Sequence, residues 1–250
     1  MKKVFERPES LHNVALRFCP GCGHSLLHRM IAESIDELGI RHRVIGIAPV
    51  GCAVFAYDYF NFDIIECAHG RPPAVATALK RVNPETVVFS YQGDGDLAAI
   101  GMAEIIHAAN RGENLSVFFI NNATYGMTGG QMAPTTLLNQ RTTTCPRGKT
   151  VASEGHPMKV SELIATIDGS VFVARTSLDN IKNVLNTKKL VKKVFENQLN
   201  GVGFSFLEIL SSCPTDWHMS PVDSLQWISN EMSKVFKNAT LKDNTGNNGQ

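Results

Sequence analysis

Short apolar runs alternate with amphipathic segments along most of the chain. Continuous apolar runs predict strands, and apolar residues at helical spacing predict helices between them. The strands are expected at 43–48, 63–68, 86–92, 115–120, 171–176 and 203–210, and the helices at 24–38, 72–82, 97–110, 158–167, 177–199 and 221–236. Apolar strands separated by helices are typical of parallel sheets that are covered on both faces. The pattern therefore predicts an α/β fold with a doubly wound, mostly parallel sheet.

The alternation continues without a repeat or a linker, so we expect a single domain. This domain spans residues 19–238, with an N-terminal arm at 1–18 and a flexible polar tail at 239–250. Residues 121–157 depart from the pattern because they are polar, rich in Thr, Gly and Pro, and lack periodicity. A loop of this length in a compact domain is usually functional or disordered. We expect residues 129–149 to close over a site or to pack on a partner subunit.

Composition and charge exclude several classes of partner. The 250 residues carry 24 Lys and Arg against 23 Asp and Glu, so a net charge of +1 gives no electrostatic case for nucleic acid or a membrane surface. No apolar run reaches the roughly 18 residues of a membrane span, and the start of the chain has no apolar signal-peptide core. We expect a cytoplasmic protein, in which the six cysteines more often bind metals or act in redox chemistry than form disulfides.

Oxygen ligands stand at both ends of the unit 91–131. Asp94 lies in a Gly-Asp-Gly turn after one expected strand, and Asn121 and Asn122 follow the next strand. One strand–helix–strand crossover fits between them, so both places would lie at the carboxyl edge of a parallel sheet, where ligands bind. Mg²⁺ prefers carboxylate, amide and carbonyl oxygens, and the backbone N–H groups of the turn suit phosphates. The sequence therefore predicts a magnesium site from Asp94, Asn122 and the Thr124 carbonyl, beside a phosphate site.

Other interpretations of these two motifs carry less weight. A Gly-Asp-Gly turn alone, or a strand that ends in asparagines alone, is common in proteins without any such site. A nucleotide site of the Rossmann type is disfavoured because no G-x-G-x-x-G opens a helix and no G-x-x-x-x-G-K-[ST] is present.

Four cysteines lie in separate turns that contain Gly or Pro, namely Cys19, Cys22, Cys52 and Cys213. Four thiolates hold either a tetrahedral zinc ion or a [4Fe–4S] cluster, and spacing alone does not decide between them. A zinc ribbon more often uses two C-x-x-C pairs, whereas only one is present. Cys67 ends an apolar strand and is expected to be buried, while Cys145 in the long loop is an alternative fourth ligand.

The motifs together resemble a known family. Gly-Asp-Gly followed at this distance by Asn-Asn resembles the diphosphate-binding signature of thiamine diphosphate enzymes. The string NNATYGMTGGQ, with CPGCG near the start, is similar to the β subunit of 2-oxoacid:ferredoxin oxidoreductases. The resemblance implies the thiamine diphosphate-binding (diphosphate-domain) fold and Mg²⁺ on the oxygen ligands. It also implies one [4Fe–4S] cluster on the four cysteines, with Cys213 preferred to Cys145.

The same resemblance assigns the other residues of the site. His69, Met127 and Thr128 are expected at the reacting part of the cofactor, with His69 near the phosphates or the thiazolium ring. From the residues alone, His69 fits equally well as a helix-capping side chain. The residues expected to bind the cofactor are Gly51, His69, Gly93, Asp94, Gly95, Asp96, Asn122, Thr124, Tyr125, Gly126, Met127 and Thr128.

The implied reaction is the oxidative decarboxylation of a 2-oxoacid with coenzyme A to acyl-CoA and CO₂, with electrons passing to ferredoxin or a ferredoxin-like subunit. Met127 and its neighbourhood favour 2-oxoisovalerate or 2-oxoglutarate over pyruvate. A chain of this length would hold only the diphosphate half of the site. The resemblance therefore implies an α subunit that supplies the pyrimidine-binding domain and the activating glutamate, in a dimer of heterodimers or a larger assembly.

Two alternatives remain open from the sequence. The first is a non-oxidative thiamine diphosphate decarboxylase or synthase subunit with a structural zinc ion. The second is a non-catalytic scaffold subunit that binds zinc through the same cysteines.

Overall fold

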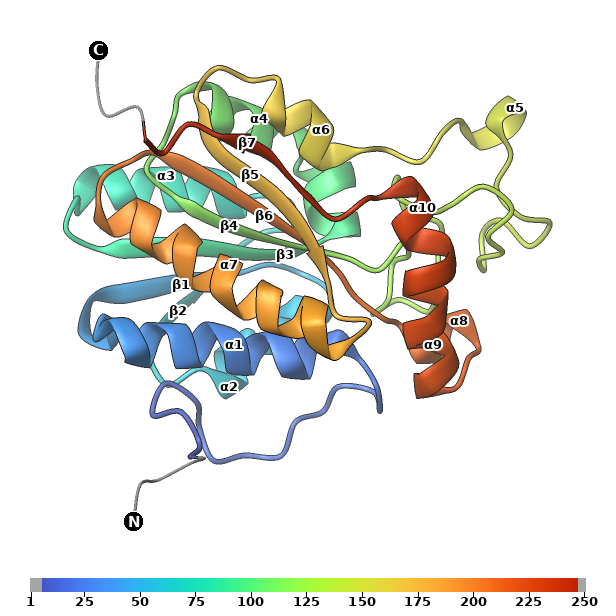
Figure 1. Ribbon diagram of the computed structural model, residues 1–250, viewed down its shortest axis with the longest axis horizontal. Coiled ribbons are helices and arrows are strands. Elements are labelled where there is room, and N and C mark those ends of the chain that lie inside the picture. The colour runs from blue at the N-terminus through green and yellow to red at the C-terminus, as the bar shows by residue number, and fades with distance from the viewer. Residues whose placement is uncertain (1–5, 247–250) are drawn as a thin grey trace.

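Residues 6–246, which the structure describes, form a seven-stranded sheet in the order β2–β1–β3–β4–β6–β5–β7 (Figure 1). The structure is a computed structural model. Strands β1 to β6 run parallel, and β7 runs antiparallel beside β5. The strands are β1 Val44–Ala48, β2 Asp63–Glu66, β3 Val87–Gly93, β4 Ser116–Asn121, β5 Ser170–Ser177, β6 Phe204–Leu210 and β7 Ala239–Asp243. The predicted α/β fold with a mostly parallel sheet is confirmed.

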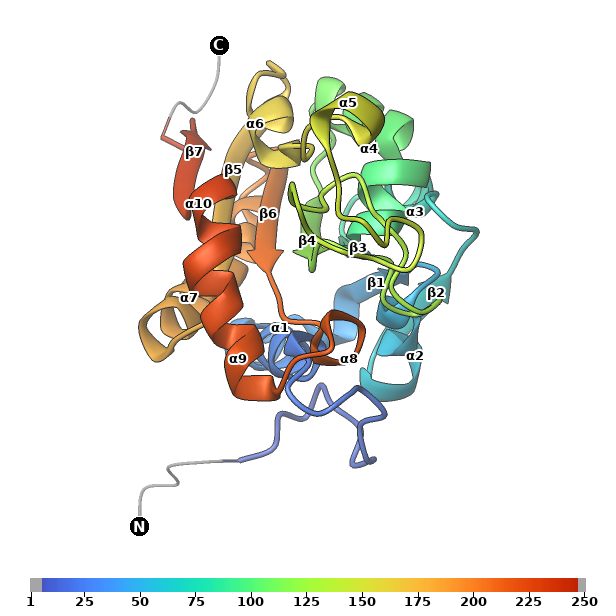
Figure 2. The same cartoon turned by 90° about the vertical axis from the view of Figure 1, so that its right-hand side faces the viewer.

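Helices cover both faces of the sheet (Figures 1 and 2). The described helices are α1 Gly23–Leu38, α2 Ala56–Tyr59, α3 Pro72–Val82, α4 Met102–Asn110, α5 Val151–Glu154, α6 Val160–Ala165, α7 Ile181–Leu199, α8 Pro214–Trp217, α9 Pro221–Trp227 and α10 Ser233–Val235. Helices α1 and α7 pack on one face, and α3, α4 and α6 pack on the other. Two ends follow the expected signals, because Pro72 and Pro73 open α3 and Gly39, with φ of 65°, ends α1.

The core lies in two layers, one on each side of the sheet. On the side of α1 and α7, Phe118 and Phe195 pack with ring centroids 5.2 Å apart, and Phe89 meets Phe195 edge to face. Strands β4 and β6 are buried along their whole length. This burial on both faces explains why these strands appear in the sequence as continuous apolar runs rather than as alternating ones.

The expectation of a flexible tail at 239–250 is wrong for its first residues. Residues Ala239–Asp243 form β7, which pairs with β5 through partners such as Val173 and Lys242. Leu241 packs against the apolar layer on the α6 side, and the pairing supplies hydrogen bonds to the otherwise open edge of β5. Tertiary packing thus overrides a polar local composition. Residues 247–250 of the tail and 1–5 of the arm lie outside the described residues.

Two predicted helices begin or continue through wider turns. The helix expected at 97–110 starts as a π-helical turn, Gly95–Ile100, before α4. The helix expected at 221–236 is divided by a second π-helical turn, Ile228–Met232, between α9 and α10. Such turns occur often at functional sites, and the first of them directly follows Asp94. No helix among the described residues is both long and apolar enough to cross a membrane.

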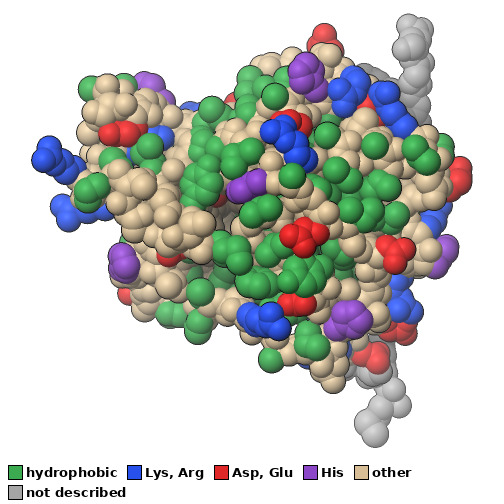
Figure 3. Space-filling view, turned by 180° about the vertical axis from the view of Figure 1, so that it is seen from behind, with side chains coloured by type: hydrophobic (Ala, Val, Ile, Leu, Met, Phe, Trp, Pro, Cys, Tyr) green, Lys and Arg blue, Asp and Glu red, His purple; other side chains and the backbone are tan. Residues whose placement is uncertain are grey.

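The first part of the long polar segment after β4 packs on the body of the molecule, where Ala133, Thr135 and Thr136 are buried, and its later part stands off from the body. It carries only the short helix α5 before α6 begins, and it projects beyond the edge of the sheet in Figure 1. Seen from behind, it forms a separate lobe (Figure 3). The expectation that residues 129–149 close over a site or pack on a partner stays a prediction.

Candidate functional site

The two oxygen-ligand motifs meet at the carboxyl edge of the sheet. Strands β3 and β4 are neighbours, and Gly93 pairs with Ile120 at their ends. The backbone N–H of Thr124 donates to Asp94 Oδ2 at 3.1 Å and to Asn122 Oδ1 at 3.3 Å. One N–H group therefore reaches an oxygen of each predicted ligand, which places the two oxygens next to each other.

Asp94 is a buried carboxyl group whose described partners are all neutral. Besides Thr124, it accepts hydrogen bonds from Gly95 N at 3.1 Å and Thr135 Oγ1 at 2.7 Å. Burial raises the pKa of Asp94 to about 7, although these hydrogen bonds oppose the shift. A divalent cation would neutralise this carboxylate, so the donor set fits Mg²⁺. The sequence did not identify Thr135, which is one of many threonines in an irregular segment.

His69 is held against a second buried carboxyl group. His69 Nδ1 lies 2.5 Å from Asp96 Oδ1, which also accepts from Gly70 N at 2.9 Å. Gln92 Nε2 donates to the other oxygen of Asp96 at 2.6 Å. Burial raises the pKa of Asp96, against the effect of these hydrogen bonds. Asp96 thus fixes the imidazole ring of His69, whose opposite edge is free to face the cavity.

A cavity of about 130 Å³ collects almost all of the predicted cofactor-binding residues. Its lining contains every one of them except Thr124. The cavity is also lined by His24, Val50 and Ala53, which the motifs did not identify, and by Cys52, one of the predicted cysteine ligands. Val50 and Ala53 follow β1, whose carboxyl end lies at the same edge of the sheet. We name this the cofactor cavity.

The wall of the cofactor cavity has no space for a side chain at Gly95. A Cβ atom at Gly95 would lie 2.2 Å from the ring of Tyr125, whose hydroxyl donates to the Gly95 carbonyl at 3.3 Å. Any side chain at this position would displace Tyr125 from the lining. The glycine is therefore required by the close approach of the two loops.

The four predicted cysteine ligands line one further cavity, of about 290 Å³, which we name the cysteine cavity. Burial, followed by the neighbouring thiols, raises the pKa of Cys22 to about 12. Burial also raises the pKa of Cys52 to about 11. Burial, followed by the nearby Asp216 carboxylate, strongly raises the pKa of Cys213. Cys213 Sγ donates to Asp216 Oδ2 at 3.2 Å. Such thiols ionise only when a cationic centre binds them, which is the chemistry of a metal site.

The remaining cysteines lie elsewhere. Cys145 is buried in a turn of the long segment, where its backbone pairs with Thr142. Cys67, expected to be buried, is only partly buried and lies near Ala48. Among residues 6–246, no three His, Cys, Asp or Glu side chains are already drawn together as ligands of one ion. Four thiols that line one cavity are a donor set that fits either a tetrahedral zinc ion or a [4Fe–4S] cluster.

The two cavities adjoin each other through a common wall. The residues that line both are His24, Cys52, Asn122, Gly126 and Met127. A group bound in one cavity would therefore lie beside a group bound in the other.

His24 of this wall belongs, with His28, to a buried aromatic cluster. His24 Nδ1 lies 2.6 Å from the Tyr91 hydroxyl, and His28 Nδ1 lies 2.7 Å from the His24 carbonyl. His28 stacks on Phe60 with ring centroids 4.7 Å apart. Burial lowers the pKa of His24 to about 3 and that of His28 to about 4. Both rings are therefore neutral in the folded protein at ordinary pH.

These two histidines should make the protein acid-labile. The unfolded chain protonates them near pH 6.5, whereas the folded chain protonates them only near pH 3 to 4, so stability is lost as the pH falls below 6.5. We expect His28→Gln to reduce the loss of unfolding free energy between pH 6.5 and 4 by about 3 kcal/mol. Denaturant unfolding of the cofactor-free chain at several pH values measures this. The exposed His107, changed to Gln, is the control, and an equal effect there would refute the assignment.

Comparison with known proteins places the chain in a family. A family model described as "Thiamine pyrophosphate enzyme, C-terminal TPP binding domain" matches residues 50–209. The ketoisovalerate oxidoreductase subunit VorA of Methanothermobacter thermautotrophicus is 46% identical, over 97% of this chain and 53% of its own length. The 2-oxoglutarate synthase subunit KorB of Methanocaldococcus jannaschii is 38% identical, over 79% of this chain and 69% of its own length.

One solved structure has a similar fold. It is a 2-oxoglutarate:ferredoxin oxidoreductase from Magnetococcus marinus with 2-oxoglutarate, coenzyme A and succinyl-CoA bound. It aligns with a TM-score of 0.75 and 25% sequence identity, over 91% of this chain and 74% of that chain. The chain spans about half the length of the VorA subunits that it matches. On the family model, the KorB identity and this structural match, the chain belongs to the thiamine pyrophosphate-binding subunits of the 2-oxoacid:ferredoxin oxidoreductase family.

Proposed function

We propose that this chain is the thiamine diphosphate-binding subunit of an enzyme that oxidises a 2-oxoacid. One 2-oxoacid anion and one coenzyme A yield acyl-CoA, CO₂ and a proton, and two electrons pass singly to ferredoxin. The observation that carries the proposal is the pair of adjoining cavities, one lined by the diphosphate motif and the other by four thiols. A decarboxylation that releases electrons needs both of these sites side by side.

In the cofactor cavity, Asp94, Asn122 and the Thr124 carbonyl would hold Mg²⁺, and Mg²⁺ would hold the diphosphate. When bound, thiamine diphosphate supplies an electron sink for carbon–carbon cleavage. His69, oriented by Asp96, faces this cavity from the end of the β2–α3 connection and would donate to or accept from a group there. Met127 and Thr128 line the same cavity and would shape the space for the substrate.

In the cysteine cavity, Cys19, Cys22, Cys52 and Cys213 would bind one [4Fe–4S] cluster. Cys52 lines both cavities, so a cluster held by these thiols would lie next to a cofactor in the adjoining cavity. Such a cluster would supply a one-electron acceptor, which suits a one-electron carrier such as ferredoxin.

The lining favours a branched-chain substrate. Val50, Ala53 and Met127 bring apolar side chains to the cofactor cavity, and its described lining contains no Lys or Arg. The second carboxylate of 2-oxoglutarate would need a cationic partner when buried, whereas the isopropyl group of 2-oxoisovalerate needs only apolar contact. We therefore propose 2-oxoisovalerate first and 2-oxoglutarate second. The name of the most similar relative cited above supports the same order.

A partner subunit is part of the proposal. Large hydrophobic side chains stay exposed in the lining of the cofactor cavity, at Val50 and Met127, and also on α2 at Tyr57 and in the π-helical turn at Ile100. Hydrophobic side chains also gather over the middle of the face seen in Figure 3. We propose that an α subunit covers part of this surface and supplies the glutamate that activates the cofactor.

The complex purified without oxygen should reduce methyl viologen when given coenzyme A and a 2-oxoacid. We expect the highest kcat/KM with 2-oxoisovalerate and no turnover without coenzyme A. Iron and sulfide analysis with visible absorbance separates a cluster from zinc, which is colourless. Full activity of this chain alone would refute the need for a partner, and a colourless zinc-containing protein would refute the proposed cluster.

A further inference from the structure

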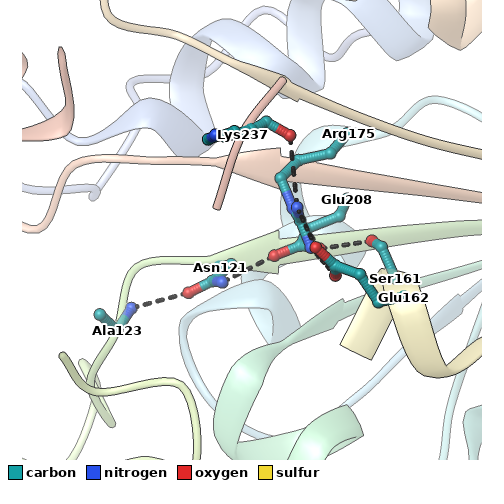
Figure 4. Close-up of polar contacts among 7 residues, drawn as sticks. All are labelled: Asn121, Ala123, Ser161, Glu162, Arg175, Glu208 and Lys237. Atoms are coloured by element: carbon teal, nitrogen blue, oxygen red, sulfur yellow. Dashed lines mark hydrogen bonds and ion pairs between the residues drawn. The ribbon is translucent and has the colours of Figure 1, made fainter. Parts of the chain in front are cut away.

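A buried network of charged side chains joins three neighbouring strands. Arg175 on β5 and Glu208 on β6 are directly paired in the sheet, and Arg175 Nε donates to Glu208 Oε2 at 2.8 Å. The next strand, β4, contributes Asn121, whose Nδ2 donates to Glu208 Oε1 at 2.7 Å. All three side chains are buried to within 1% of their surface (Figure 4).

The network occupies the last two rows of an apolar face, with Arg175 and Glu208 in one row and Asn121 in the next. Two residues earlier on the same strands stand Val173, Phe206 and Phe119, which belong to the apolar layer on the α6 side. Because strand side chains alternate with a period of two, each strand changes from an apolar to a polar residue along this face, β5 and β6 at Arg175 and Glu208 and β4 two residues further on, at Asn121. Asn121 is in register with Leu210 and Ser177, which end β6 and β5 at the carboxyl edge where the cofactor cavity lies. The packing of a hydrophobic core therefore does not explain why the charges of Arg175 and Glu208 are buried at this position.

Glu208 has a complete set of donors. Ser161 Oγ on α6 also donates to its Oε2. Arg175 in turn binds both oxygens of Glu162 and the Lys237 carbonyl. Burial disfavours the charge on Arg175, but the carboxylates of Glu208 and Glu162 outweigh it and raise its pKa. The carboxyl group of Glu208 thus faces donors only, with Asn121 on one oxygen and Arg175 and Ser161 on the other.

This property sets the direction of the Asn121 amide. Its NH₂ group must face Glu208, so its oxygen faces the loop that follows β4. There, Asn121 Oδ1 accepts the N–H of Ala123 at 3.1 Å. Ala123 has φ of 56°, in the left-handed region that is unfavourable for a non-glycine residue. The amide thus secures an unfavourable backbone conformation between Asn122 and Thr124.

We propose that Arg175 and Glu208 are positioning residues for the cation site, and that they act through the amide of Asn121. The inference rests on the proposed function, because it takes Asn122 and Thr124 to be cation ligands. The left-handed turn at Ala123 directs the Asn122 side chain and the Thr124 backbone toward Asp94. Loss of the acceptor at Glu208 frees the Asn121 amide to rotate, and the turn between the two ligands relaxes.

A purely stabilising role would not need these charges. A buried ion pair is often no better for stability than apolar side chains of similar size, and replacing both partners is frequently neutral or stabilising. Replacing one partner alone, by contrast, leaves an uncompensated charge and threatens the fold. The informative variant is therefore the double substitution Arg175→Met/Glu208→Met, which removes the two fully buried charges together and leaves Glu162, whose side chain is 39% exposed.

The test measures cation affinity separately from stability and from turnover. Mn²⁺ replaces Mg²⁺ as a paramagnetic probe, and its binding to the assembled complex is titrated by EPR with thiamine diphosphate present. We expect the double variant to keep the melting temperature of the cofactor-free protein while its Kd for Mn²⁺ rises by about tenfold or more, as for other groups that orient metal ligands. Adding Asn121→Ala to the double variant should weaken binding no further.

Thr176→Val is the matched control. Thr176 is buried on the same strand, but its hydroxyl lies 2.9 Å from that of Thr187 on the opposite face. It should leave the Kd for Mn²⁺ unchanged. Equal affinity in the wild type and the double variant would overturn the positioning role alone and leave the proposed function intact. Absence of Mn²⁺ binding to the wild type would overturn both, since no cation site would then exist to be positioned.

Discussion

Asp94→Asn is expected to lower the affinity for Mg²⁺ and thiamine diphosphate by more than about 100-fold, a larger loss than is typical of groups that only orient metal ligands. The substitution removes the one carboxylate among the three proposed ligands, so the cation keeps only neutral oxygens. Calorimetric titration of the complex measures both affinities. Thr135→Val is the matched control, because it removes one donor to Asp94 but keeps the charge. It should weaken binding only by a small factor.

The same substitution should stabilise the cofactor-free chain at pH 8. The folded-state pKa of Asp94, about 7, lies above its unfolded value of 3.8, so the carboxyl group destabilises the fold increasingly as the pH rises through this window. Removal of the carboxyl group should raise the unfolding free energy by about 4 kcal/mol at full effect. The asparagine loses one hydrogen bond of the carboxylate, which reduces this gain by about 1 kcal/mol. The gain should disappear below about pH 3.8, where the group is protonated in both states.

Stability and binding should therefore change in opposite directions in this variant. Mg²⁺ with thiamine diphosphate should raise the melting temperature of the wild type and leave that of Asp94→Asn unchanged, because only the wild type binds them. A variant that is less stable without cofactor and still responds to it would contradict the assignment of Asp94.

The sequence predicted most of the sheet because its central strands are buried on both faces and so appear as unbroken apolar runs. It missed β7, since the residues of Ala239–Asp243 are largely polar and their pairing with β5 depends on an edge that only the tertiary fold creates. The two interrupted helices were predicted as continuous, because a π-helical turn keeps the apolar periodicity nearly intact.

The candidate site was predictable where adjacent motifs follow parallel strands. The Gly-Asp-Gly turn and the two asparagines had to meet once β3 and β4 were neighbours. Thr135 could not be predicted, because nothing in the sequence specifies the path of an irregular loop back to Asp94. Arg175 and Glu208, by contrast, can be recognised in the sequence as residues that need a buried partner. Each is a lone charge inside an otherwise apolar strand, and such a charge needs a partner on a neighbouring strand.

The choice between Cys145 and Cys213 as the fourth ligand also depends on the tertiary fold. Both precede proline in polar turns, so local sequence does not distinguish them. Their surroundings do, because Cys213 follows β6 at the carboxyl edge of the sheet and lines the cysteine cavity. Cys145 lies in the segment that projects from the body, buried against its own turn. The difference arises from topology, which the order of the strands determines.

Cys213→Ser is accordingly expected to remove most of the iron from the complex and to reduce methyl viologen turnover by at least about 100-fold, while Cys145→Ser leaves both unchanged. A serine hydroxyl is a poor replacement for a thiolate on iron, and the remaining three cysteines offer no fourth sulfur ligand in the cysteine cavity. Thiamine diphosphate binding should persist in Cys213→Ser, because Cys213 does not line the cofactor cavity. Iron and sulfide analysis, visible absorbance and EPR of the reduced protein measure the cluster, and calorimetry measures the binding of the cofactor.

Loss of iron in Cys145→Ser with retention in Cys213→Ser would reverse the assignment. Loss of cofactor binding together with the iron in Cys213→Ser would instead show that the two cavities depend on each other for their structure.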